Sequence, residues 1–132
     1  MLNLRKQRMK RLTCAVVEDE PLAIQMLVGY IARRADLELI SVMDNVCDFD
    51  EVIKKIMPDI IFLDFKTPCF DGDIGKILIS ISTASAIINI SASPVSHFTN
   101  TMPKSLNRDI HELLKPFSFE KFNECIDFLL NN

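Results

Sequence analysis

Short apolar runs alternate along the chain with longer segments in which apolar residues recur every three or four positions. The short runs have the length of buried β-strands, and the longer segments have the period of helices that are packed on one side. We expect strands at 12–17, 37–43, 60–63, 86–90 and 110–114, and helices at 22–31, 49–56, 74–81 and 119–130.

Strands that alternate with helices are typical of βαβ units, which build a parallel sheet covered by helices on both faces. The length of 132 residues suits one such domain. The predicted fold class is therefore α/β, a single doubly wound, flavodoxin-like domain. We expect its five-stranded parallel sheet to have the order 2-1-3-4-5, with about five helices.

Charge is distributed unevenly between the start of the chain and the rest. The chain has a net charge of −3, and residues 1–11 carry +5, which leaves −8 for the remainder. We interpret residues 1–10 as a basic, disordered tail and 11–132 as the folded domain, with no direct contact to nucleic acid. The basic residues of the first segment are Arg5, Lys6, Arg8, Lys10 and Arg11.

The composition bears on the cellular compartment in which the protein works. No stretch approaches the roughly 20 consecutive apolar residues that cross a bilayer, and the N-terminus does not resemble a signal peptide. The four cysteines lie far apart without a CxxC pair, which favours reduced thiols over a zinc site or a disulfide framework. We expect a cytoplasmic protein without membrane contact.

Acidic residues follow two of the predicted strands. Glu18 and Asp19 come directly after the first strand, and Asp64 follows the third. These strands are neighbours in the predicted order, so the three carboxylates should converge at one edge of the sheet. Crowded carboxylates favour a bound cation, and Mg²⁺ prefers one or two carboxylates together with a phosphate. Taken singly, each acid could equally be a solvated residue at a strand end.

Two further residues at the same edge could handle a phosphoryl group. Ser91 follows the fourth strand and offers a hydroxyl donor, and Lys115 follows the fifth and offers a positive charge. Phosphoryl transfer needs an in-line nucleophile and charge neutralisation, which an aspartate, a divalent ion, a hydroxyl and a lysine can supply. Each of the two residues alone would be unremarkable on a protein surface.

Four motifs together span most of the chain and resemble the receiver domains of response regulators. They read VVEDEPLA at 16–23, PDIIFLDFKTPCFDG at 58–72, IINISAS at 87–93 and ELLKPF at 112–117. The resemblance implies that Asp64 is the phosphoacceptor and that Ser91 and Lys115 bind the phosphoryl group. It also implies that Mg²⁺ is held by Glu18, Asp19, Asp64 and the backbone carbonyl of Lys66.

The resemblance has further implications for partners and for one peptide bond. It implies phosphorylation by a sensor histidine kinase in a two-component system, with a homodimer as one assembly and a DNA-binding effector domain, absent from this chain, as one partner. It implies a cis peptide between Lys115 and Pro116, since X-Pro bonds tolerate the cis form. The run EDEPLA is similar to receivers that precede LytTR-type DNA-binding domains.

The chain departs from the receiver pattern in three places. Glu112 stands where the family has an aromatic residue that turns inward on phosphorylation, and we expect this carboxylate to stay outward because its burial is costly. The 92–109 segment contains Pro94 and Pro103, which predicts a short, shifted or irregular fourth helix. The side chain of Lys66 is expected to point into solvent.

Two other functions stay open at this point. The chain could be a receiver-like protein-interaction module that no longer switches, as Glu112 and the 92–109 segment suggest. It could instead be an aspartate-nucleophile phosphatase of the haloacid dehalogenase type, but such enzymes carry a second aspartate at the position of Lys66. We do not expect this chain to be an enzyme, since a receiver catalyses only its own phosphorylation and slow dephosphorylation.

Overall fold

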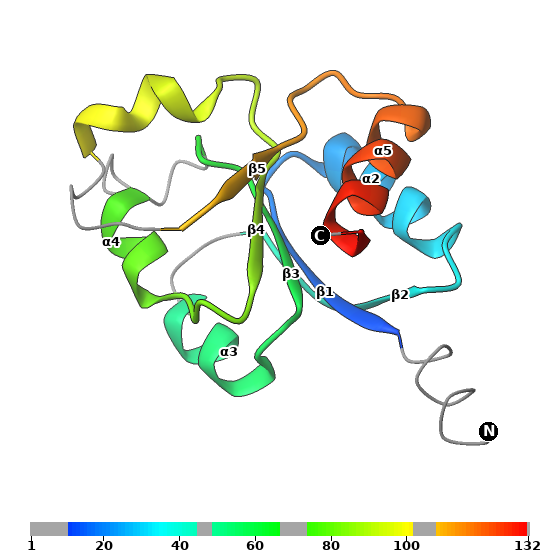
Figure 1. Ribbon diagram of the computed structural model, residues 1–132, viewed down its shortest axis with the longest axis horizontal. Helices are drawn as coiled ribbons and strands as arrows, with labels where there is room; N and C mark the ends of the chain where they lie inside the picture. The colour runs from blue at the N-terminus through cyan, green and yellow to red at the C-terminus, as the bar shows by residue number, and fades with distance from the viewer. Residues whose placement is uncertain (1–10, 45–48, 67–73, 102–107, 132) are drawn as a thin grey trace.

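The computed structural model describes residues 11–44, 49–66, 74–101 and 108–131 (Figure 1). The predicted basic tail at 1–10 lies outside these residues, as does the part of the motif at 58–72 that follows Lys66. Among the described residues, no helix has the length and apolar character needed to cross a membrane.

A five-stranded parallel sheet forms the centre of the domain, in the order β2-β1-β3-β4-β5. This confirms the predicted fold class and strand order. A register shift between Cys14 and Ala15 interrupts the pairing of β1 with β2, and no sequence pattern predicts it. The strands are β1 (Leu12–Val17), β2 (Leu37–Met43), β3 (Ile60–Leu63), β4 (Ala86–Asn89) and β5 (Ile110–Glu112).

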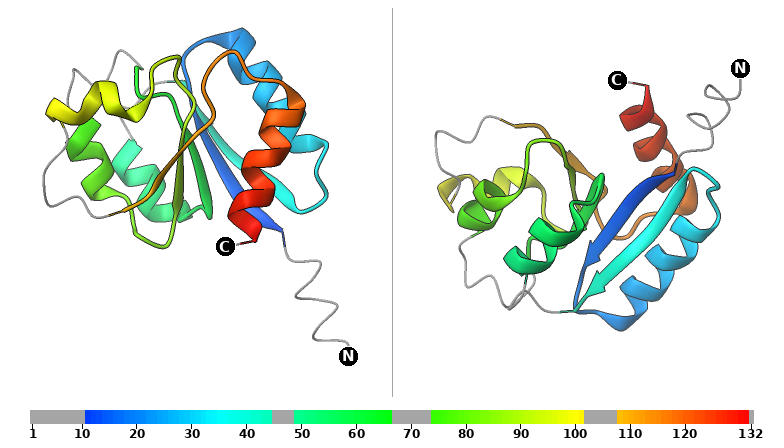
Figure 2. Two further views of the ribbon diagram at one scale, coloured as in Figure 1. Left: turned by 45° about the horizontal axis from the view of Figure 1, so that its top comes forward. Right: turned by 90° about the horizontal axis from the view of Figure 1, so that it is seen from below.

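Helices α2 (Pro21–Ala32) and α5 (Phe119–Leu130) cover one face of the sheet (Figures 1 and 2). Their apolar stripes meet alternate residues of the strands in a core that includes Leu27, Phe62 and Phe122. Phe62 and Phe122 stack with their ring centroids 5.9 Å apart. The apolar side of α5 is therefore core packing, through Phe122 and Ile126 with Phe119 and Leu129 beside them.

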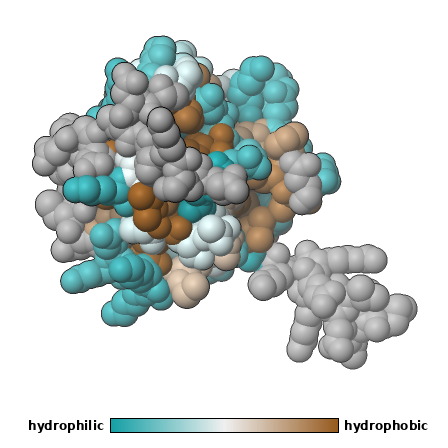
Figure 3. All heavy atoms as spheres, turned by 60° about the vertical axis from the view of Figure 1, so that its left-hand side comes forward, coloured by the Kyte–Doolittle hydropathy of each residue, from teal (hydrophilic) through white to brown (hydrophobic). Residues whose placement is uncertain are grey.

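Helices α3 (Phe49–Ile56) and α4 (Ile74–Ser80) cover the opposite face of the sheet. The segment after β4 forms a 3₁₀ helix, η2 (Val95–Thr101), where the fourth helix of the chain was expected. The described residues thus contain four α-helices, and the prediction of a short, irregular helix in the 92–109 segment is confirmed. On the side of the molecule that carries α4 and η2, apolar and polar side chains are interspersed on the surface (Figure 3).

Parallel pairing brings the carboxyl ends of the strands to one edge of the sheet. Asp64 N donates to Val17 O at 3.0 Å, and Ile90 N donates to Leu63 O at 3.0 Å, so the ends of β1, β3 and β4 are in line. The residues that follow these strands are therefore held next to one another by backbone hydrogen bonds. This edge carries the candidate site.

Candidate functional site

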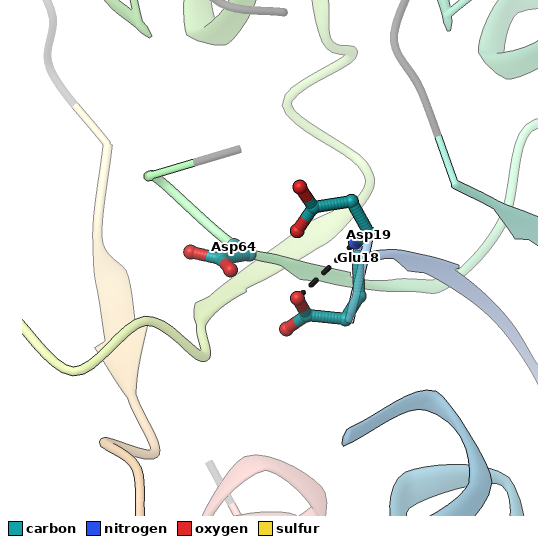
Figure 4. A group of neighbouring side chains, drawn as sticks. All are labelled: Glu18, Asp19 and Asp64. Atoms are coloured by element: carbon teal, nitrogen blue, oxygen red, sulfur yellow. Dashed lines mark hydrogen bonds between the residues drawn. The ribbon is translucent and has the colours of Figure 1, made fainter. Parts of the chain in front are cut away.

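Three carboxylates gather at the carboxyl edge of the sheet, as the sequence predicts. One oxygen from each of Glu18, Asp19 and Asp64 lies within 4.8 Å of the others (Figure 4). Glu18 and Asp64 are buried, whereas Asp19 is exposed. The first strand and the third therefore contribute to one acidic cluster that is open to solvent on the side of Asp19.

The carboxylate of Asp64 is fixed by its own turn and by a cation. Its Oδ1 accepts a hydrogen bond of 2.9 Å from Lys66 N, and its Oδ2 lies 3.3 Å from Lys115 Nζ. The residue is only 6% exposed, so water does not provide most of its solvation. A carboxylate held in this way is positioned to act as a nucleophile.

Glu18 is the most deeply buried acid of the cluster, with no exposed surface. Its Oε1 accepts hydrogen bonds from the backbone N–H groups of Asp19 and Glu20, both at 3.1 Å. The pKa of Glu18 is raised from its ordinary value of 4.5 to about 7: burial is the main cause, the neighbouring Asp64 also raises it, and the hydrogen bond with the cation of Lys115 lowers it. This carboxyl therefore titrates close to neutral pH.

The ammonium group of Lys115 lies among the carboxylates. Its Nζ is 2.6 Å from Glu18 Oε2, 3.3 Å from Asp64 Oδ2 and 3.5 Å from Glu20 Oε2. Burial opposes the positive charge, but the contacts with Glu18 and Asp64 outweigh it and raise the pKa of Lys115. Lys115 thus stays protonated and offsets part of the negative charge. The Lys115–Pro116 peptide is cis, as the resemblance implies.

Ser91 lies at the same edge, but its hydroxyl is engaged by its own turn. Oγ donates to Ser93 O at 2.8 Å and accepts from Ser93 N at 3.2 Å. The backbone ties Ser91 to the site, since its carbonyl accepts from Lys115 N at 3.2 Å. Ser91 is therefore joined to Lys115 through the backbone, while its hydroxyl is engaged by Ser93.

The two unusual residues occupy the positions that we expected. The side chains of Lys66 and Glu112 are both exposed, so the predictions that they point outward are confirmed. Glu112 is nevertheless bound, because its Oε2 accepts a hydrogen bond of 2.6 Å from Val95 N at the start of η2. The predicted contribution of the Lys66 carbonyl to metal binding stays a prediction.

The donor set fits a hard divalent cation. Glu18 Oε2 is a buried oxygen that accepts no well-aligned hydrogen bond from the described residues and has only the ion pair with Lys115. It is joined by oxygens of Asp19 and Asp64, and oxygen ligands from a few carboxylates are those that Mg²⁺ takes. The charge of the cluster also calls for more neutralisation than one lysine gives.

Sequence reasoning missed two residues of this region. Glu20 contributes a third acid near Lys115, and its position in the run Glu18-Asp19-Glu20 is the signal that could have identified it. Asn89 is a fully buried amide in an otherwise apolar strand, and its Oδ1 accepts from Ser91 N at 3.0 Å. A polar residue inside a buried strand is a signal in itself, because it needs hydrogen-bond partners.

Comparison with curated proteins finds response regulators. The chain is 26% identical over 116 residues to an uncharacterized response regulatory protein of Shewanella oneidensis, covering 87% of this chain and 47% of that protein. It is 32% identical over 57 residues to the transcriptional regulatory protein BtsR of Escherichia coli, covering 43% of this chain and 24% of BtsR. The chain thus spans about half, or less, of the length of these relatives.

Solved structures of receiver domains have the same fold. The signal receiver domain of NarL from Mycobacterium tuberculosis superposes with a TM-score of 0.73 at 18% identity, covering 93% of this chain and 98% of that one. A DNA-binding response regulator of the LuxR family from Staphylococcus aureus gives a TM-score of 0.71 at 22% identity, covering 92% of this chain and 99% of that one.

No protein-family model matches the chain. The relatives do not assign it to the LytTR-type subgroup, which stays a prediction. The same family is indicated by four observations: the motifs, the sequence relatives, the strand order and the acidic cluster. The chain is thus similar in sequence to response regulators and has the fold of their receiver domains, which serve two-component signalling.

Proposed function

We propose that this chain is a phosphoacceptor receiver, phosphorylated on Asp64 by a sensor histidine kinase. The observation that carries the proposal is the position of Asp64, which lies beside two other carboxylates and beside the ammonium group of a lysine. Its carboxylate lies in a cluster with Glu18 and Asp19, and Lys115 Nζ is 3.3 Å from its Oδ2. A nucleophile, an anionic metal-binding cluster and a fixed cation are the parts that phosphoryl transfer requires.

The reaction is a single displacement at phosphorus. A carboxylate oxygen of Asp64 forms a bond to phosphorus while the bond from phosphorus to the donor breaks. The electron pair of the broken bond leaves with the donor, which is the imidazole of a phosphohistidine or the acetate of acetyl phosphate. Lys115 then faces the new phosphoryl oxygens, and the Ser91 hydroxyl can donate to one of them after it turns from Ser93.

Mg²⁺ belongs to the proposal as the resident cofactor. Glu18, Asp19, Asp64 and the Lys66 carbonyl would hold it, and it would supply neutralisation of the phosphoryl oxygens. Burial of Glu18 keeps one of these ligands away from water, and exposure of Asp19 leaves an open side from which a hydrated ion can enter.

The proposal extends to the setting of the protein. We infer that it works in the cytoplasm as a regulator that turns over no separate substrate. Its relatives include the transcriptional regulatory protein BtsR, which makes a DNA-binding effector domain a reasonable downstream partner. A homodimer is a second assembly to test, by measuring the mass of the phosphorylated and unphosphorylated protein in solution.

The test is phosphorylation by acetyl phosphate in the presence of Mg²⁺, followed by intact mass measurement. The wild-type chain should gain one phosphoryl group, and Asp64→Asn should gain none. Asp109→Asn is the matched control, because Asp109 is an exposed aspartate that precedes β5 at the opposite edge of the sheet. Equal labelling of Asp64→Asn and wild type would show that Asp64 is not the phosphoacceptor.

One observation favours a second candidate function. Glu112 lies outward on β5 at the position where receivers carry an aromatic residue, so the chain could be an interaction module that does not switch. In that case neither acetyl phosphate nor Mg²⁺ would change the protein. Absence of labelling together with absence of Mg²⁺ binding would make this second function the better one.

A further inference from the structure

A buried amide organises the turn that carries Ser91. Asn89 has no exposed surface, its Oδ1 accepts from Ser91 N at 3.0 Å, and its Nδ2 donates to Ser93 O at 2.9 Å. Ser91 Oγ donates to the same carbonyl. The Asn89 side chain therefore joins Ser91 to Ser93 on the buried side of the turn. The Ser93 carbonyl accepts from two donors, Asn89 Nδ2 and Ser91 Oγ.

The same turn leads directly into η2, which is tied to β5. Val95 N donates to Glu112 Oε2 at 2.6 Å, and Asn89 Nδ2 lies 3.5 Å from that oxygen. A carboxylate that accepts a backbone N–H at the first residue of a helix acts as an N-terminal cap. Glu112 thus joins the last strand, the buried amide and the start of η2.

An aromatic contact links η2 to the residue that follows the acceptor. Phe65 is buried, and its ring meets that of Phe98 of η2 edge to face, with centroids 5.5 Å apart. The position of η2 therefore depends on the turns after both β3 and β4. These are the two turns that flank the phosphoryl site.

We propose that Asn89 and Glu112 are positioning residues through which η2 responds to phosphorylation of Asp64. This inference rests on the proposed function. Asn89 fixes the Ser91–Ser93 turn, and Glu112 fixes the first residue of η2 against that turn. The two residues thereby connect the Ser91 hydroxyl with η2 by polar contacts, where the family uses an aromatic residue of β5.

The connection works because one hydroxyl has two competing acceptors. A phosphoryl oxygen on Asp64 is anionic and attracts the Ser91 hydroxyl more strongly than the neutral carbonyl of Ser93 does. When Oγ turns, Ser93 N loses its acceptor and Ser93 O keeps only Asn89 as a donor. The turn then loosens, and Val95, two residues further on, shifts against Glu112.

The experiment compares amide hydrogen exchange with and without Mg²⁺ and beryllofluoride, a mimic of the aspartyl phosphate. The variants are Glu112→Ala, Glu112→Gln and Asn89→Ala, and the matched control is Glu38→Ala, an exposed glutamate on strand β2. Binding of beryllofluoride at Asp64 is followed separately by fluorine NMR. Phosphorylation of Asp64 by acetyl phosphate is measured separately by intact mass.

In the wild-type protein, beryllofluoride should make the amides of Ser93 and Val95 exchange severalfold faster. In Glu112→Ala, the Val95 amide should exchange about tenfold faster at the start, because a charge-assisted hydrogen bond is lost, and beryllofluoride should add no further change. Glu112→Gln should restore part of the protection, since its amide oxygen can accept from Val95 N. Asn89→Ala should loosen both amides and slow the labelling of Asp64.

Unchanged exchange in a wild-type protein that has bound beryllofluoride would overturn the inference and leave the proposed function intact. A Glu112→Ala variant that responds as Glu38→Ala does would also overturn it. If the wild-type chain takes up neither beryllofluoride nor a phosphoryl group, the proposed function fails first and the inference falls with it. The separate fluorine and mass signals distinguish these failures.

Discussion

Lys115 Nζ lies 2.6 Å from Glu18 Oε2, although the two residues are 97 positions apart in the chain. The Glu18 side chain is 1% exposed and that of Lys115 is 21% exposed, so the pair joins a buried acid to a cation with access to water. A buried acid with one such partner responds to protons, to metal ions and to loss of that partner.

The affinity for Mg²⁺ should depend on pH because of Glu18. Its pKa is about 7 in the folded protein, so a proton competes with the metal for this carboxylate below about pH 7. Calorimetric titration should show a dissociation constant that falls with rising pH, by up to about tenfold per unit, and levels off above about pH 7. Glu18→Gln should lose this dependence, and Glu38→Gln should keep it.

The same shift has the opposite consequence for the metal-free protein. Because the folded state holds this proton more tightly than the unfolded state, the stabilising contribution is present below the ordinary pKa of 4.5 and is lost as pH rises through about 7. Urea unfolding without Mg²⁺ should therefore show that Glu18→Gln gains stability relative to wild type at pH 8 and not at pH 4. Equal differences at both values would contradict the assignment.

Replacement of Lys115 by methionine should destabilise the protein and make its stability depend more on Mg²⁺. Removal of one partner of a fully buried pair costs about 3–5 kcal/mol, and partial exposure of Lys115 reduces the expected loss to about 1–3 kcal/mol. Thermal unfolding with and without Mg²⁺ measures both effects. Lys121→Met is the control, since that side chain is 69% exposed and has only a distant partner.

Much of this site could be predicted because strand ends are visible in the sequence. The runs that end at Val17 and Leu63 are apolar, and the acids that follow them mark the edge of the sheet. Parallel topology then brings Glu18, Asp19 and Asp64 together without further knowledge of side chains. The bounds of β4 and β5 were predicted one and two residues too long at their ends, where pairing stops.

Contacts that depend on the course of a loop could not be predicted. The outward position of Glu112 follows from the cost of burying a charge, but its partner Val95 is 17 residues away and is placed by the path of η2. The turn of the Ser91 hydroxyl toward Ser93 depends likewise on the local backbone, which no apolar pattern encodes. The proposed connection between the site and η2 depends on these contacts, and only the structure reveals them.

Arg34 joins the end of α2 to α5, and its loss should cost stability without changing the phosphoryl site. Its guanidinium donates to both carboxylate oxygens of Asp36, at 3.0 and 2.9 Å, and to Asn123 and Asp127 of α5. Arg34→Lys should lose about 1–2 kcal/mol in urea unfolding, because an ammonium cannot reproduce the planar fork. Lys54→Ala, at an exposed position of α3, should change little.

The same pair should contribute to acid unfolding. The hydrogen bond from Arg34 lowers the pKa of Asp36 below its ordinary value of 3.8, although burial acts against this. Stability from the pair is therefore complete above that value and is lost as pH falls through the lower pKa of the folded protein. Wild type and Arg34→Lys should thus differ less in stability at pH 2 than at pH 7, as measured by circular dichroism.

Thr13 and Asp59 lock the starts of β1 and β3 together, and a double-mutant cycle should reveal their coupling. Asp59 Oδ2 accepts from Thr13 N at 2.8 Å and from Thr13 Oγ1 at 3.1 Å, and Thr13 Oγ1 accepts from Asp59 N at 3.0 Å. Thr13→Val keeps the shape and removes the hydroxyl, while Asp59→Ala removes the carboxylate. Each single variant should lose about 1–2 kcal/mol in urea unfolding, and the double variant should lose less than the sum by about 0.5–1 kcal/mol. Strict additivity would mean that the two residues stabilise their strands independently, and the reciprocal hydrogen bonds would then have no energetic role.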